Sequence, residues 1–141
     1  MKTLNQYIKE KLVINKDYKD YKDDIVVKSF DELRKIIKYR YNKLGPGTKQ
    51  DPIDFNDIDV SNLDSFCNNK YQGIFEGTKF KYIDITYWDV SNIESMRGMF
   101  YGCEELKSVG DISKWNVSNV IYKNGAFNNC PIKEEYKPKF K

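Results

Sequence analysis

The stretch DITYWDVSN at residues 84–92 returns 27 positions later as DISKWNVSN at residues 111–119. A second matched block follows each of them at the same distance, GMFYGC at residues 98–103 and GAFNNC at residues 125–130. Two blocks that keep one spacing indicate an internal repeat, which is typical of proteins built from stacked units.

An earlier and more degenerate copy precedes these two. Residues 57–62 read DIDVSN and residues 73–77 read GIFEG, so both blocks are present in the same order. About five extra residues, 68–72, are inserted between the two blocks of this first copy. We therefore expect about three copies over residues 51–132.

Each copy predicts a short strand, a turn, and then one or two helical turns. Alternation of apolar and polar residues at the start of a copy indicates a strand with one buried face. The Ser-Asn pair that follows suits a turn, because both side chains can bind backbone groups. One copy cannot bury its own apolar side, whereas stacked copies can, with equivalent strands paired in a parallel sheet. The matching apolar positions are Ile53, Phe55, Ile58 and Val60, then Ile83, Ile85, Trp88 and Val90, then Val109, Ile112, Trp115 and Val117.

The pattern D-I-S-x-W-D-V-S-N-V-x-x-M-x-x-M-F-x-G-C resembles the BspA-like leucine-rich repeats of bacterial surface proteins. The resemblance covers roughly residues 53–132 and is closest in the second copy. It implies a leucine-rich-repeat-like fold and a role in adhesion or protein binding, and it implies no catalytic residues. The third copy has Lys123 and Ala126 where that family usually has Met, and the first copy has Phe66 for Met and Thr78 for Cys.

The N-terminal 50 residues follow a different pattern. Ser29 and Glu32 form a capping box, and the Gly45-Pro46 pair ends the helix that the box begins. A strand over residues 24–28 and a weaker helix over residues 4–14 are expected before it. The predicted helix has an apolar face of Phe30, Leu33, Ile36, Ile37, Tyr41 and Leu44, and a basic face of Arg34, Lys35, Lys38, Arg40 and Lys43.

The predicted fold class is therefore α+β, a short leucine-rich-repeat-like solenoid with a small parallel sheet and an N-terminal amphipathic helix as its cap. A cap is needed because the end of a stack of repeats exposes its apolar core. Residues 1–50 are expected to form the cap, residues 51–132 a solenoid of about three coils, and residues 133–141 a loose basic tail.

Composition excludes several classes of function. The chain has no His, so histidine-based catalysis and His-ligated metal sites are excluded. Three Cys without a CxxC motif argue against a disulfide framework or a zinc site. No stretch approaches the roughly 18 apolar residues of a membrane span, and the N-terminus lacks the apolar region of a signal peptide. We predict no enzyme activity, no cofactor and no metal, and a cytoplasmic protein that does not contact membranes.

Repeated residue types are interpreted first as packing. Trp88 and Trp115 occupy equivalent positions and are expected to be buried, whereas Tyr87 beside Trp88 is expected to be more open. Cys103 and Cys130 are also equivalent, which favours a ladder of small buried side chains.

The leading functional hypothesis is a protein-binding module. Outward strand positions in a stack form rows, and a partner protein can read such a row. The predicted partner-binding residues form an acidic-polar stripe of Asp54, Asp84 and Asp111 with Asn56, Thr86 and Ser113, next to Tyr87. A basic partner surface would suit it.

Two alternatives stay open at this point. One is a small phage-encoded inhibitor of a host defence nuclease, similar to an anti-CRISPR protein. Residues 51–130 carry 12 acidic and 7 basic side chains and could compete for a nucleic-acid groove. The other is direct nucleic-acid binding through the basic face of the 30–44 helix.

Overall fold

The computed structural model describes residues 25–140, and these residues form an α+β fold. This part of the chain contains four short strands, β1 (Ile25–Val26), β2 (Ile53–Asp54), β3 (Ile58–Asp59) and β4 (Ile83–Asp84). The same residues contain the helix α2 (Phe30–Leu44) and the 3₁₀ helix η2 (Glu134–Tyr136). The helix predicted over residues 4–14 lies outside the described residues.

The strands pair in parallel as two sheets of two strands each. Strand β2 pairs with β4, with Ile53 opposite Ile83 and Asp54 opposite Asp84, so equivalent residues of the first and second copies face each other. Strand β1 pairs with β3. The register confirms the predicted alignment of the first two copies.

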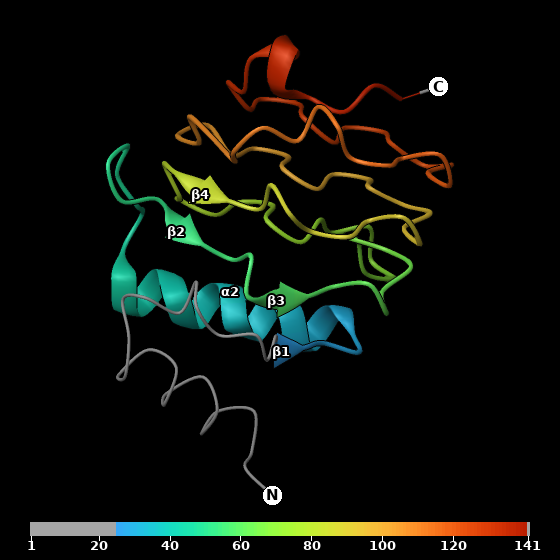
Figure 1. Ribbon diagram of the computed structural model, residues 1–141, viewed down its shortest axis with the longest axis horizontal. Coiled ribbons are helices and arrows are strands. Elements are labelled where there is room, and N and C mark those ends of the chain that lie inside the picture. Colours follow the sequence, from blue (N-terminus) through green and yellow to red (C-terminus); the bar gives the residue numbers. More distant parts are fainter. Residues whose placement is uncertain (1–24, 141) are drawn as a thin grey trace, which may run out of the picture.

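Hydrogen bonds continue this register through the second half of each copy. Phe75 donates its backbone N–H to Met99 O at 3.0 Å, and Phe100 donates to Ala126 O at 2.8 Å. Figure 1 shows the result, in which the chain passes back and forth in successive layers from α2 to the C-terminal segment. Each layer therefore supplies hydrogen-bond partners for the backbone of the next layer. Such partners are needed because water does not reach the backbone groups inside the stack.

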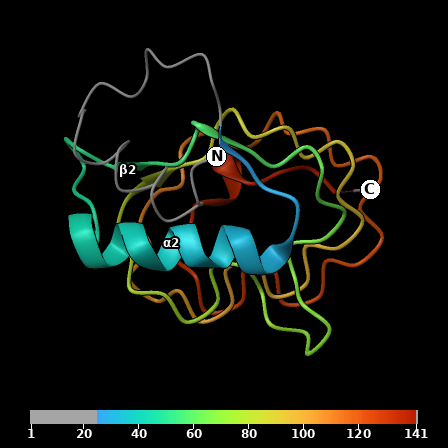
Figure 2. The same ribbon diagram turned by 90° about the horizontal axis from the view of Figure 1, so that it is seen from below.

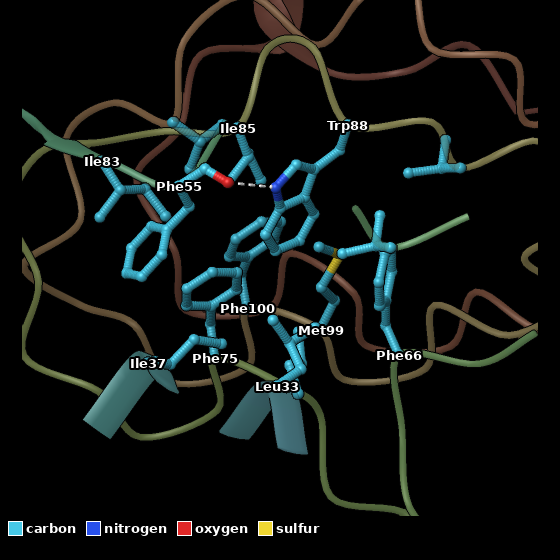
Figure 3. Packing of buried hydrophobic residues seen from close by; sticks show 14 of the residues in the cluster. Leu33, Ile37, Phe55, Phe66, Phe75, Ile83, Ile85, Trp88, Met99 and Phe100 are labelled. Atoms are coloured by element: carbon cyan, nitrogen blue, oxygen red, sulfur yellow. Dashed lines mark hydrogen bonds between the residues drawn. The ribbon is translucent and has the colours of Figure 1, made fainter. Parts of the chain in front are cut away.

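Aromatic side chains at equivalent positions form a ladder through the core. The rings of Phe75 and Phe100 stack with centroids 5.4 Å apart and planes 10° apart, and Phe127 stacks on Phe100 at 5.3 Å. Figure 3 shows Phe75 and Phe100 among the labelled residues of this core, with Leu33 and Ile37 of α2 beside them. The ladder arises because one position recurs in parallel layers.

The capping box that begins α2 is present, with one difference. Ser29 Oγ accepts from the N–H of Glu32 at 3.1 Å, as predicted. Glu32 Oε2 accepts from the N–H of Lys28, one residue earlier than the usual partner. Gly45, with φ of 77°, ends the helix by donating its N–H to Tyr41 O.

Helix α2 lies across one end of the layers, as Figure 2 shows from below. Leu33, Ile36 and Ile37 are fully buried against the first copy, which agrees with the predicted apolar face. Leu44 differs from the prediction, since 44% of its surface is exposed. It is the last helical residue, and the chain turns away immediately after it.

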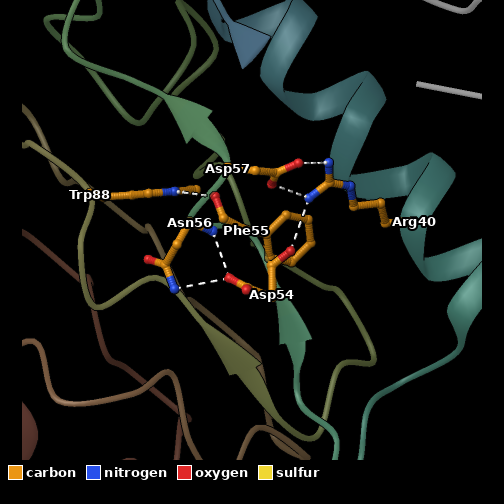
Figure 4. A network of polar contacts seen from close by, with 6 residues as sticks. All are labelled: Arg40, Asp54, Phe55, Asn56, Asp57 and Trp88. Atoms are coloured by element: carbon orange, nitrogen blue, oxygen red, sulfur yellow. Dashed lines mark hydrogen bonds and ion pairs between the residues drawn. The ribbon is translucent and has the colours of Figure 1, made fainter. Parts of the chain in front are cut away.

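Arg40 was predicted on the exposed basic face, and this prediction is wrong. Its relative exposure is 1%, and its guanidinium donates two hydrogen bonds of 2.7 Å to the carboxylate of Asp57 (Figure 4). A third bond reaches Asp54 O at 2.9 Å. Position 40 lies one turn after Ile36 and Ile37, so it faces the first copy, where a buried acid neutralises the charge.

The C-terminal segment is packed rather than loose. Ile112 donates its N–H to Tyr136 O at 3.3 Å, and Pro138 is buried. Lys137 Nζ lies 5.0 Å from the centre of the Phe127 ring. The segment therefore covers the end of the third copy, opposite α2, because that copy would otherwise expose the last ring of the ladder.

Candidate interaction surface

The insertion in the first copy forms a small hairpin that projects from the layers. We call residues 68–72 the insertion hairpin. Cys67 and Gly73 pair at its base in antiparallel fashion, and Asn68 donates its N–H to Gln72 O at 2.9 Å. The side chain of Asn68 accepts from the N–H groups of Lys70 and Gln72 at 2.9 and 3.0 Å. These bonds hold the hairpin in one conformation.

Tyr71 lies in the insertion hairpin with a backbone that aromatic residues seldom adopt. Its φ is +63°, in the left-handed region, and 66% of its surface is exposed. A bulky residue at positive φ is uncommon and tends to persist where surrounding structure fixes it, often at functional sites. Burial does not explain a large ring held in this position.

Arg97 lies between Tyr71 and a tyrosine of the third copy. Its guanidinium carbon is 4.6 Å from the centre of the Tyr71 ring and 6.0 Å from that of Tyr122. Tyr122 is 52% exposed. The guanidinium donates no hydrogen bond to any of residues 25–140, so its donors remain available to a ligand.

We call Tyr71, Arg97 and Tyr122 the aromatic–arginine cluster. Its three side chains come from three successive copies, and the exposed Ile121 is adjacent to Tyr122 in the chain. Tyr and Arg are enriched among the residues that contribute most to protein–protein binding, because they combine large contact area with directed donors. The stacking also restricts Arg97, which lowers the entropy lost when it binds.

The predicted acidic-polar stripe is present, but local structure explains its acids. Asp84 Oδ1 accepts from Thr86 N–H at 3.0 Å and from Thr86 Oγ1 at 2.7 Å. Asp111 binds Ser113 in the same way, and Asp54 binds Asn56 through both the backbone and the side chain. The same turn occurs at Asp89 and at Asn116, so each carboxylate serves first to shape a turn.

Electrostatics differ along the stripe. Burial raises the pKa of Asp54, and the neighbouring carboxylate of Asp84 adds to this effect. The hydrogen bonds from Ser113 lower the pKa of the exposed Asp111. Tyr87 is 82% exposed, in agreement with its predicted open position, and its N–H binds Asn56 Oδ1 at 2.9 Å.

The basic face of α2 is smaller than predicted. Arg34 is half-buried and donates to the backbone carbonyls of Ile74 and Glu76, so it joins the helix to the first copy. Together with the burial of Arg40, this leaves Lys35, Lys38 and Lys43 as the exposed cations of that face.

The repeated Trp residues are packed, as predicted. Trp88 Nε1 donates to Phe55 O at 2.8 Å, and Trp115 Nε1 donates to Thr86 O at 3.2 Å, so each indole joins its layer to the previous one. Cys103 is also buried, and its Sγ donates to Phe75 O at 3.0 Å, whereas the equivalent Cys130, predicted to be buried as well, is partly exposed. Burial raises the pKa of the Cys103 thiol to about 11, which keeps it protonated at neutral pH.

The sequence interpretation missed the aromatic–arginine cluster. The signal was the insertion itself, because residues added to one copy of a repeat usually lie in a loop on its surface. Among residues 25–140, no three His, Cys, Asp or Glu side chains are grouped so that they could hold a metal ion. Nor does that part of the chain contain a helix long and apolar enough to cross a bilayer.

Comparison with protein families gives one match. Residues 49–135 match the family described as "Mycoplasma protein of unknown function, DUF285". The matched range contains all three copies and most of η2, and it excludes α2. No curated protein and no solved structure matches the chain.

Proposed function

Because this chain belongs to the DUF285 family through its repeats, we propose that these repeats form a short leucine-rich-repeat-like solenoid that binds another protein without catalysis. The parallel register of β2 and β4 and the aromatic ladder support the solenoid. The resemblance of residues 53–132 to BspA-like repeats supports the binding role. In such an architecture the interior is used for stacking, and the surface is free to vary.

The observation that carries the proposal is the unpaired guanidinium of Arg97 between two exposed tyrosine rings. Residues needed for stacking recur from copy to copy, as the Phe ladder and the Asp turns do. Tyr71 does not recur, because it belongs to an insertion that only the first copy has. A partner that covers the aromatic–arginine cluster would bury both rings and bind the guanidinium, a combination typical of a binding hot spot.

In the test, the full chain and its variants are each used to capture partner proteins from a cell lysate. The captured proteins are then quantified by mass spectrometry. Replacing Tyr71 by Ser and Arg97 by Ala is expected to reduce the captured amount at least about tenfold, because hot-spot side chains each contribute about 2 kcal/mol or more. Tyr87→Ser is the comparison variant, since it removes an exposed tyrosine beside the predicted stripe and outside the aromatic–arginine cluster, and it should change capture less than about twofold.

The predicted stripe is tested in the same experiment. Asp84→Asn with Asp111→Asn removes two charges while keeping the turns, as Asn116 already does in the third copy. If a partner protein is lost from this variant but is still captured by the Tyr71→Ser, Arg97→Ala variant, the binding surface is the stripe and not the aromatic–arginine cluster. A captured nuclease would favour the inhibitor alternative.

A further inference from the structure

A groove of about 500 Å³ runs beside β4 and is built from parts of the chain that are far apart in sequence. The loop after α2 contributes Lys49, the second copy contributes Tyr82 and Asp84, and the third copy contributes Lys107. The C-terminal segment completes it with Lys133 and Tyr136. We call this site the lysine groove, and the C-terminal segment takes part in it because that segment packs onto the third copy.

Cations dominate the lysine groove. None of the three lysine ammonium groups forms an ion pair within residues 25–140. Asp84 is the acid of the lining, and its Oδ1 is occupied by Thr86. The other carboxylate oxygen of Asp84, Oδ2, accepts no hydrogen bond from residues 25–140, so it is available to a donor group of a ligand.

The third copy departs from the repeat at this place. Gly110 is an extra residue there, with φ of +83°. A Cβ on it would lie 2.1 Å from Thr86 Oγ1 and 2.8 Å from Asp84 Oδ1, so any side chain would collide with the turn that holds Asp84. Gly110 therefore allows the third copy to approach Asp84 closely while the groove stays open.

We infer that the lysine groove binds a phosphorylated sugar. Lysines act as compact charged donors to phosphate oxygens, and three of them around one groove suit a ligand with several negative charges. The free oxygen of Asp84 accepts a hydrogen bond from a sugar hydroxyl, which a phosphate alone cannot supply. Tyr82 and Tyr136 provide apolar surface for the remainder of the ligand. This site is separate from the aromatic–arginine cluster and does not depend on protein binding.

The experiment is calorimetric titration of the full chain with a ribonucleoside triphosphate and, separately, with tripolyphosphate, at low salt. The first variant changes Lys49, Lys107 and Lys133 to Gln. Its control changes Lys35, Lys38 and Lys43 of α2 to Gln, which removes the same charge elsewhere. The groove variant is expected to bind the nucleotide at least about tenfold more weakly, while the control stays within about twofold. Equal losses in both variants, or no binding by the unmodified chain, would overturn the proposal.

A second variant tests the sugar. Asp84→Asn keeps the turn, as Asn116 does with Ser118, and leaves the lysines unchanged. It is expected to weaken the nucleotide about threefold or more, because the amide oxygen stays in the turn and the Nδ2 group that replaces the free carboxylate oxygen cannot accept a hydrogen bond. Binding of tripolyphosphate should be unchanged or tighter, because a nearby negative charge is removed. Tighter binding of both probes by the same factor would show that Asp84 does not contact a hydroxyl, and would contradict the assignment.

Discussion

Replacing Asp57 by Ala is expected to lower the free energy of unfolding by about 3–5 kcal/mol, since it removes a buried carboxylate that pairs with the buried guanidinium of Arg40. Arg40 and Asp57 are both buried and are joined by two hydrogen bonds of 2.7 Å. Arg40 also donates to Asp54 O, but this acceptor is a neutral carbonyl and does not replace the carboxylate. Denaturant unfolding should show the loss directly, and the melting temperature should fall by on the order of 10 °C.

Two further variants test whether the loss of stability comes from the unbalanced charge or from the substitution itself. Arg40→Met combined with Asp57→Ala removes both charges and is expected to cost less than Asp57→Ala alone. Lys38→Ala, on the exposed face of the same helix, should change stability by less than about 0.5 kcal/mol. If Asp57→Ala proved as mild as Lys38→Ala, the pair would not be the buried link between α2 and the first copy.

Changes in the N-terminal cap formed by α2 are expected to produce the second large loss of stability. Ile37 is fully buried between α2 and the first copy, so Ile37→Asp would place an unpaired charge in the core and should cost several kcal/mol. Domains of this size have a total stability of only about 5–15 kcal/mol. A chain that begins at Asp51 lacks the whole cap and is expected to be insoluble or to lose cooperative melting.

The matched control for Ile37→Asp is Lys38→Asp, which makes the same side chain at the next, exposed position. Calorimetry should find a large loss for the first and a small one for the second. Cooperative melting of the shortened chain at the full-length temperature would show that α2 is an appendage. Its exposed lysines would then become the better candidate for the functional surface.

Periodic features of the chain could be predicted from its sequence. The repeat placed Ile53 opposite Ile83, the capping box located the start of α2, and equivalent positions indicated that Trp88 and Trp115 are buried. These features depend on short-range rules or on one spacing repeated several times, so the residues themselves contain the necessary information.

Features that depend on contacts between distant residues could not be predicted in this way. Arg is usually an exposed residue type, and the position of Asp57 across the interface is what allows Arg40 to be buried. Tyr71 and Tyr122 lie 26 and 25 residues from Arg97 in the chain, and no local pattern brings these side chains together. The packing of the C-terminal segment is also invisible in its Lys- and Pro-rich composition.

Deleting residues 68–72 tests most directly the claim that the repeats provide the fold and the insertion hairpin provides the binding. The deletion joins Cys67 to Gly73, which already pair at the hairpin base, and it reproduces the uninterrupted Arg97-Gly98 of the second copy. The measurement is the melting temperature of this variant together with its capture of partner proteins. We expect the melting temperature to stay within a few degrees (roughly 1 kcal/mol or less) while capture falls at least about tenfold. Full capture by a variant that melts normally would contradict the account, as would unfolding caused by the deletion.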